Sequence, residues 1–147
     1  MGALLEIKEL QKTFKLKSFF GATTQVHALN GISLAIAKGE SLGIVGESGC
    51  GKSTLANLLI RLDEPTAGAI FLDGQNISHA KEKDLRKLRS RIQIVFQDPY
   101  SSLSPRMTVE QILTEPMRVA GDKTGEEMRK KAVALLELVG MRERSLT

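Results

Sequence analysis

The residues best suited to chemistry form a glycine-rich stretch that ends in a lysine and a serine, from position 46 to position 53. They fit the pattern G-x-x-x-x-G-K-[ST], which binds nucleotide phosphates. The glycines let the backbone turn sharply and bring N–H groups close to phosphate oxygens. The lysine would reach the β- and γ-phosphates of ATP, and the serine hydroxyl would ligate Mg²⁺. The predicted nucleotide-binding residues are Gly46, Glu47, Ser48, Gly49, Cys50, Gly51, Lys52, Ser53 and Thr54.

The segments on either side of this loop have the order that such a loop requires. Residues 41–45 form a compact apolar run, which predicts a strand. Leucines follow the loop with the spacing i, i+3, i+4 and i+7 of a buried helical stripe, at Leu55, Leu58, Leu59 and Leu62. The N-terminus of this helix, near Gly51, would add partial positive charge to the site. This context favours phosphate binding over a glycine-rich turn without a ligand.

Apolar runs and turn-forming residues predict the remaining strands. We expect them at 4–10, 29–37, 69–72 and 92–96. A surface loop is expected over 15–25, because this stretch mixes Lys, Ser, Gly and Thr. Asp73 and Gly74 are typical of a tight hairpin turn.

Three further helices are predicted from periodic apolar residues and from capping signals. Residues 81–91 indicate a charged helix with apolar residues on one face. Thr108 and Gln111 form a capping box for a short helix, which Pro116 should break. A last amphipathic helix is expected over 128–139, with Gly140 as its terminator.

The composition indicates a soluble domain and disfavours several classes of site. The chain has 147 residues, 41% hydrophobic and 26% charged, and no run near the ~20 apolar residues of a membrane span. One cysteine excludes an intrachain disulfide and a cysteine-rich metal cluster. The net charge of +4 comes without basic and aromatic residues in alternation, so no nucleic-acid partner is expected. His27 and His79 have no partners at ligand spacing and should lie on the surface.

Two segments resemble one family of nucleotide-binding proteins. Residues 45–54, Val-Gly-Glu-Ser-Gly-Cys-Gly-Lys-Ser-Thr, look like the Walker A motif of ABC transporter ATPases. Residues 94–106, Ile-Val-Phe-Gln-Asp-Pro-Tyr-Ser-Ser-Leu-Ser-Pro-Arg, resemble the Q-loop of the oligopeptide, dipeptide and nickel importers, with Ser104 where Asn is usual. Residues 26–34 and 64–70 also look like family segments, so the resemblance spans nearly the whole chain.

The resemblance implies roles for individual residues. Gln97 would approach Mg²⁺ and the catalytic water, so that Lys52 and Gln97 are the expected catalytic residues and Ser53 and Gln97 the residues at the metal. An aromatic residue near the first strand would stack on adenine, and Phe14 is in the expected place. A core role for Phe14 stays open, and the phenylalanines at 19 and 20 are rivals for the stacking role.

The implied fold is α/β, the P-loop NTPase core of an ABC ATPase. It would contain an incomplete parallel sheet flanked by helices and a small antiparallel β-portion. The family continues with a signature motif, a Walker B strand and a switch histidine, none of which occurs before Thr147. Residues 58–66 mimic a Walker B strand, but Asp63 would lie ~16 Å from Lys52 along one helix at 1.5 Å per residue, so Asp63 and Glu64 should mark the helix end. We therefore expect residues 1–147 to be the N-terminal part of an ATP-binding domain.

The implied function is that of an importer subunit, which couples ATP binding and hydrolysis to peptide or nickel uptake. Its partners would be a second ATPase subunit, arranged head to tail, and the membrane permease subunits. Its place would be the cytoplasmic face of the inner membrane. Without Walker B carboxylates this chain alone should bind ATP far better than it hydrolyses it. The alternatives are a nucleotide-binding module without catalysis and another P-loop NTPase or kinase.

Overall fold

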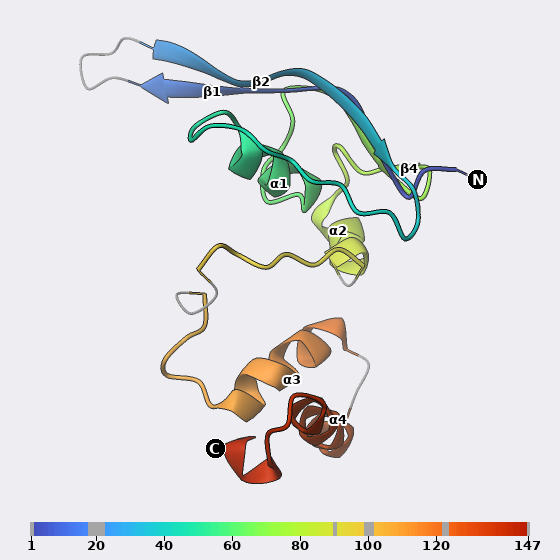
Figure 1. The fold of residues 1–147 in the computed structure, drawn as a ribbon, viewed down its shortest axis with the longest axis vertical. Helices are drawn as coiled ribbons and strands as arrows, with labels where there is room; N and C mark the ends of the chain where they lie inside the picture. Colours follow the sequence, from blue (N-terminus) through green and yellow to red (C-terminus); the bar gives the residue numbers. More distant parts are fainter. Residues whose placement is uncertain (1, 18–22, 90, 99–101, 122–123, 147) are drawn as a thin grey trace. The chain divides into compact units, whose positions relative to one another are not determined.

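The computed structural model describes residues 2–17, 23–89, 91–98, 102–121 and 124–146. They divide into two compact units, Met1–Ile92 and Gln93–Thr147 (Figure 1). Among the described helices, none has the length and apolar character needed to cross a membrane.

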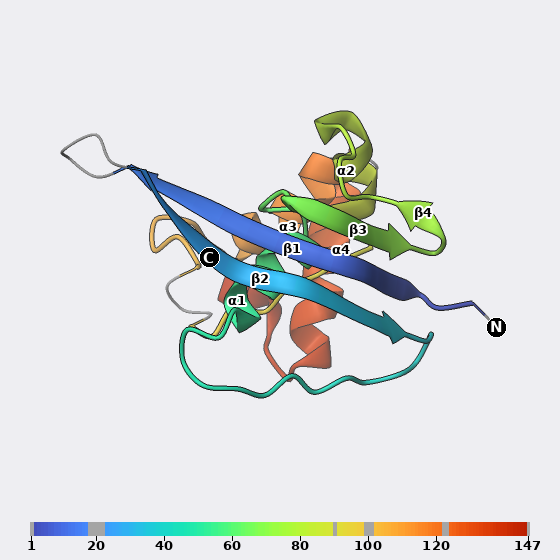
Figure 2. The same ribbon diagram turned by 90° about the horizontal axis from the view of Figure 1, so that it is seen from above.

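The first unit is built on a four-stranded antiparallel sheet with the strand order β2-β1-β3-β4 (Figure 2). The strands are β1 (Leu5–Lys17), β2 (Thr23–Ile36), β3 (Ala67–Leu72) and β4 (Gln75–Asn76). β1 pairs with β2 along its whole length, whereas its pairing with β3 stops at Gln11. The far ends of β1 and β2 therefore project beyond the sheet as a two-stranded ribbon.

This ribbon shows that the loop predicted over 15–25 is wrong for the residues that the structure describes. Lys15 pairs with Gln25, and Lys17 pairs with Thr23. Threonine is favoured in strands, but composition alone does not reveal the partner strand that lies opposite. Phe19 and Phe20, the rivals for adenine stacking, lie outside the described residues.

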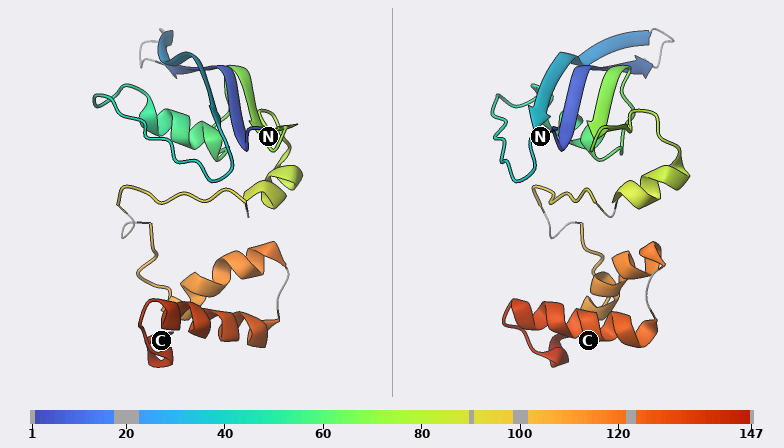
Figure 3. Two further views of the ribbon diagram at one scale, coloured as in Figure 1. Left: turned by 45° about the vertical axis from the view of Figure 1, so that its right-hand side comes forward. Right: turned by 90° about the vertical axis from the view of Figure 1, so that its right-hand side faces the viewer.

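Helix α1 (Lys52–Leu59) covers one face of the sheet (Figure 3). The predicted leucine stripe is confirmed at Leu55 and Leu58, which are 3% and 0% exposed and pack in the core of the unit. Leu62 is instead 59% exposed, because the helix ends at Leu59. Arg61 takes a left-handed conformation, with φ 58°, and its N–H group donates to the Leu58 carbonyl. This is the usual way for a helix to stop, but with an arginine where glycine is common.

The remaining core of this unit comes from the inner faces of the strands and from helix α2 (Glu82–Arg89). The predicted hairpin turn is confirmed, since Asp73 and Gly74 connect β3 to β4 with φ values of 48° and 76°. Leu85 and Leu88 are the buried residues on the described part of α2. The buried core residues are Ile7, Leu10, Leu29, Leu55, Leu58, Ile70, Leu72, Ile77, Leu85 and Leu88.

The segments 41–45 and 92–96 were expected to be strands, but neither joins the sheet formed by the described residues. Ile44 is 47% exposed, Val45 94% and Val95 86%. A strand needs a hydrogen-bonded neighbour, which local sequence does not supply. The antiparallel portion of the predicted α/β fold is thus present, while a parallel portion is not formed within the described ranges.

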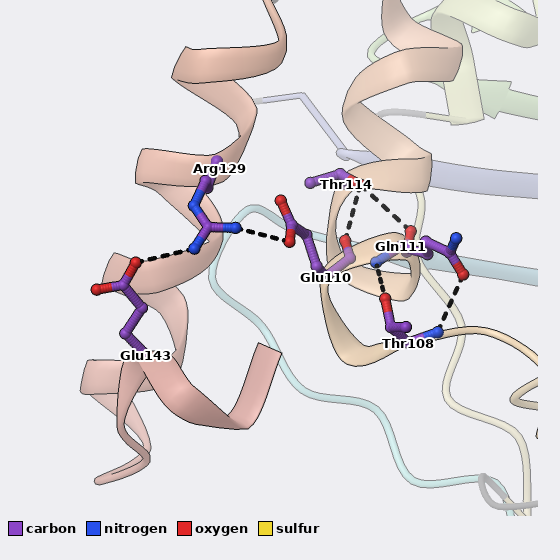
Figure 4. Close-up of polar contacts among 6 residues, drawn as sticks. All are labelled: Thr108, Glu110, Gln111, Thr114, Arg129 and Glu143. Carbon is purple, nitrogen blue, oxygen red and sulfur yellow. Dashed lines mark hydrogen bonds and ion pairs between the residues drawn. The ribbon is translucent and has the colours of Figure 1, made fainter. Parts of the chain in front are cut away.

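The second unit packs α3 (Val109–Ala120) against α4 (Gly125–Leu138) and a short 3₁₀ helix, η1 (Glu143–Leu146). Ala132, Leu136 and Leu146 form its buried centre. Outside this centre, Arg129 of α4 donates to Glu110 of α3 at 2.9 Å and to Glu143 of η1 at 3.0 Å (Figure 4). The hydrogen bond to Glu143, together with the charge of Glu110, raises the pKa of Arg129.

The capping box at Thr108 and Gln111 is confirmed, and both hydrogen bonds are visible in Figure 4. The break predicted at Pro116 is wrong, because α3 continues through it to Ala120. A proline removes one backbone hydrogen bond, whereas α3 is fixed at both ends. Gly121 closes the far end in a left-handed conformation, and its N–H group donates to the carbonyls of Met117 and Arg118.

Helix α4 shows the expected C-terminus and an N-terminal cap that sequence reasoning missed. Gly140 follows the helix with φ 75°, and the N–H of Met141 donates to the Leu136 carbonyl, which confirms the predicted terminator. At the other end Thr124 and Glu127 form a second capping box. Its signal, a threonine three residues before a glutamate, was present in the sequence.

Candidate phosphate-binding site

The glycine-rich loop leads directly into α1, as the pattern predicts. Gly49 and Gly51 have φ values of 82° and 99°, in the region that favours glycine. Gly51 is the N-cap residue of α1, so Lys52 is the first residue of the helix. At Gly46 an added Cβ would lie 2.7 Å from the sulfur of the exposed Cys50, whose side chain would have to shift.

The end of the loop packs tightly against β2. A Cβ on Gly51 would lie 2.6 Å from the Ala28 carbonyl oxygen and 2.8 Å from a Leu29 methyl carbon. Ala28 is the extra residue of a β-bulge, because Lys12 pairs with Leu29 while the next residue, Thr13, pairs with His27. The sheet thus fixes the start of α1, and with it the loop. Neither the bulge nor this contact was predicted from the sequence.

The Lys52 side chain folds back over the loop. Its ammonium donates to the carbonyl of Gly46 at 2.7 Å and to that of Glu47 at 2.6 Å. It also lies 3.5 Å from the Cys50 sulfur. The positive charge is therefore held directly above the glycine-rich backbone, where a charged phosphate oxygen would be a stronger acceptor than these carbonyls.

The N-terminus of α1 differs from those of α3 and α4. Thr108 and Thr124 cap those two helices with their side chains, and acidic residues occupy both first turns. α1 has no side-chain cap and no acidic residue in its first turn. The first N–H groups of a helix lack partners within the helix and carry partial positive charge. No capping side chain satisfies those of α1, which makes this helix start a candidate anion site.

The hydroxyls and loop residues named from the sequence all surround this helix start. Ser53 is exposed in the first turn and Thr54 is half-buried beside it. Glu47, Ser48 and Cys50 are exposed in the loop. The local sequence, with its three glycines and the helix behind them, therefore fits a nucleotide with Mg²⁺, which the Ser53 hydroxyl would help to hold.

Phe14 and Gln97 are located on different units. Phe14 is half-buried in β1, outside the hydrophobic core cluster, and the Lys12 ammonium lies 4.8 Å from its ring centroid. Gln97 is exposed and belongs to the second unit. Its approach to the metal and its catalytic role stay predictions, as does the stacking of Phe14 on adenine.

The acidic residues after α1 have structural partners, as expected for a helix end. Asp63 lies 3.6 Å from the Lys12 ammonium, and the buried Arg61 pairs with Glu64 at 3.4 Å. His27 and His79 are exposed, which confirms their surface placement. Among the residues described, no group of three or more His, Cys, Asp and Glu is placed to hold a metal ion.

Comparison with known proteins decides the family. The model of the ABC transporter family matches residues 29–147, which is most of the chain and includes the whole glycine-rich loop. This chain belongs to the ABC transporter family. ABC relatives include the oligopeptide transport ATP-binding protein AppF of Bacillus subtilis, 45% identical over 94% of this chain and 43% of its own length. The dipeptide transport ATP-binding protein DppF of Escherichia coli is 40% identical over 95% of this chain and 42% of its own length.

Solved ABC cassettes share the fold. The ATP-binding cassette MJ0796, in a dimeric post-hydrolysis state bound to ADP and Pi, matches with a TM-score of 0.76 and 31% identity. The match covers 97% of this chain and 60% of that one. The cassette cbiO1 from Clostridium perfringens matches with a TM-score of 0.69 and 32% identity, over 96% of this chain and 52% of that one. The expected α/β fold of an ABC ATPase is thereby confirmed, although this chain spans about two fifths of the curated relatives it matches.

Proposed function

We propose that this chain is part of the ATP-binding subunit of a peptide importer and that residues 46–54 bind the phosphates of ATP. The observation that carries the proposal is the start of α1, which lacks a side-chain cap and lies behind a glycine-rich loop with the Lys52 ammonium folded over it. Those features together form a cationic cup for terminal phosphates. Relatives named as oligopeptide and dipeptide transport ATP-binding proteins support peptide as the solute. Nickel stays an alternative solute.

Each site residue has a proposed role. Lys52 would exchange its loop carbonyls for β- and γ-phosphate oxygens, and loop N–H groups would bind the same phosphates. Ser53 would place its hydroxyl at Mg²⁺, with Gln97 near the metal and the attacking water. Phe14 would stack on the adenine. The bound Mg²⁺ would supply charge neutralisation for phosphoryl transfer, which depends on positioning and electrostatic stabilisation.

The proposed partners follow from the same family. Dimeric cassette structures support the association of two ATP-binding subunits. A head-to-tail arrangement of the two is part of the proposal. Permease subunits would contact the loop around Gln97, and the protein would then lie at the cytoplasmic face of the inner membrane. Hydrolysis by this chain alone is proposed to be weak, since the Walker B carboxylates are not part of residues 1–147.

The test is ATP binding by Lys52→Ala, with His79→Ala as a control on an exposed residue of the same unit. We expect Lys52→Ala to abolish binding in equilibrium titrations and His79→Ala to bind like the parent chain. ATP binding that survives Lys52→Ala would refute the site. Phosphate release is measured in the same samples to distinguish ATP binding with weak hydrolysis from efficient hydrolysis. Rapid turnover by this chain alone would contradict the proposal of weak hydrolysis.

A further inference from the structure

A partly buried lysine connects the ribbon of β1 to the segment that follows α1. The Lys12 side chain is only 13% exposed, although lysine is among the residues that are most rarely buried. Its ammonium donates to the Glu64 carbonyl at 2.8 Å and lies 3.6 Å from a carboxylate oxygen of Asp63. These two partners fix the position of the charge.

The same ammonium lies over the ring of Phe14, 4.8 Å from its centroid. A cation within ~6 Å of a ring centroid is attracted to the aromatic face. Phe14 is partly exposed and does not belong to the core cluster, so hydrophobic packing alone does not explain its position. Lys12 therefore restrains the ring from one side.

The contact between Lys12 and Phe14 lies in the part of β1 that pairs with β2 but not with β3. β3 stops pairing with β1 at Gln11, so Phe14 lies on the two-stranded ribbon. Two hydrogen bonds hold the base of this ribbon to the segment after α1. The Thr13 N–H donates to the Thr66 hydroxyl at 3.0 Å, and the Thr66 N–H donates to the Gln11 carbonyl at 2.8 Å. Lys12 adds a connection from that segment to the ring itself.

We propose that Lys12 is a positioning residue that holds the Phe14 ring in place for the adenine of ATP. The inference rests on the proposed stacking of Phe14 on the base. The glycine-rich loop and α1 carry the proposed phosphate site, and Asp63 and Glu64 after α1 hold Lys12. The residues proposed for the base and for the phosphates are therefore connected through α1. A ring that is already fixed loses less conformational freedom when the nucleotide binds.

The experiment compares ATP with inorganic tripolyphosphate, which lacks the base, by calorimetric titration of the intact chain. Lys12→Met keeps the apolar stem and removes the charge. We expect it to weaken ATP binding about 3- to 10-fold, which corresponds to about 0.6–1.4 kcal/mol, and to leave tripolyphosphate binding unchanged. Lys12→Arg should restore most of the affinity, because arginine also stacks on aromatic faces. Lys15→Met, at an exposed position on the same strand, should leave the affinities for both ligands unchanged.

Phe14→Ala separates the two ideas. The stacking is supported if Phe14→Ala weakens the binding of ATP but not of tripolyphosphate. The positioning is supported as well if the double variant Phe14→Ala with Lys12→Met binds ATP no more weakly than Phe14→Ala does. Unchanged ATP affinity in Phe14→Ala would refute the stacking and, with it, the role of Lys12. A loss in Phe14→Ala without a loss in Lys12→Met would leave the stacking intact and overturn the positioning. An equal loss for tripolyphosphate in Lys12→Met would also overturn it, since the lysine would then act through the fold.

Discussion

Gly51 offers the sharpest test of how the sheet fixes the phosphate site, through the substitution Gly51→Ala. Two costs add at this position. A residue with a side chain at φ 99° pays about 1–2 kcal/mol for the left-handed backbone. The new Cβ would also lie 2.6 Å from the Ala28 carbonyl oxygen, and forcing atoms into a packed site costs about 1–3 kcal/mol. The sum is about 2–5 kcal/mol, a large part of the total stability of a typical domain.

Two other glycines separate these costs. Gly49 has φ 82° with open space around an added Cβ, so Gly49→Ala should cost only about 1–2 kcal/mol for the backbone. Gly125 has neither a positive φ nor a close neighbour, so Gly125→Ala should be neutral or slightly stabilising.

The assay is urea unfolding followed by circular dichroism, with ATP titration of each variant that stays folded. From most to least stable, the expected order of the variants is Gly125→Ala, Gly49→Ala and Gly51→Ala. ATP binding should fall most in Gly51→Ala, because the start of α1 must move away from β2. Equal losses of unfolding free energy in Gly51→Ala and Gly49→Ala would refute the reasoning, since the close approach to Ala28 would then contribute nothing to the cost.

Two further predictions concern the core and the second unit. Leu58→Ala, at a fully buried position, should lower the free energy of unfolding in urea by about 2–5 kcal/mol. Leu62→Ala, at a position that is 59% exposed, should lower it hardly at all. Similar decreases in the two variants would contradict the helix end at Leu59. Arg129→Met should lower the melting temperature of the second unit. The pKa of Arg129 is raised by Glu143 and Glu110, so its contribution is complete below the ordinary pKa of arginine and is lost only as pH rises through the raised value. The difference between Arg129→Met and the parent should therefore be the same at about pH 7 and pH 9, and a difference that shrinks over this range would contradict it.

Much of the site could be predicted because its features are local. Glycine at 49 and 51, lysine at 52 and a helix behind them follow from backbone freedom and periodicity within fifteen residues of chain. The cap of α3 was predicted for the same reason, since a capping side chain and its target are three residues apart, and the same signal was present but overlooked at α4. Helix ends were harder to predict. Arg61 stops α1 in a conformation that glycine usually takes, and Pro116 remains within α3.

The sequence by itself determined the glycine-rich loop, its helix and the family to which the chain belongs, because these depend on residue types at fixed short spacings. Only the tertiary structure decided what lies beside them. The length of the ribbon depends on pairing between β1 and β2, and segments 41–45 and 92–96 stay outside the sheet formed by the described residues. The contact of Gly51 with Ala28 and the placement of Lys12 between Phe14 and Glu64 join residues far apart in the chain. Such contacts form between side chains and backbone that local preference does not bring together, so they appear only once the strands and α1 have packed.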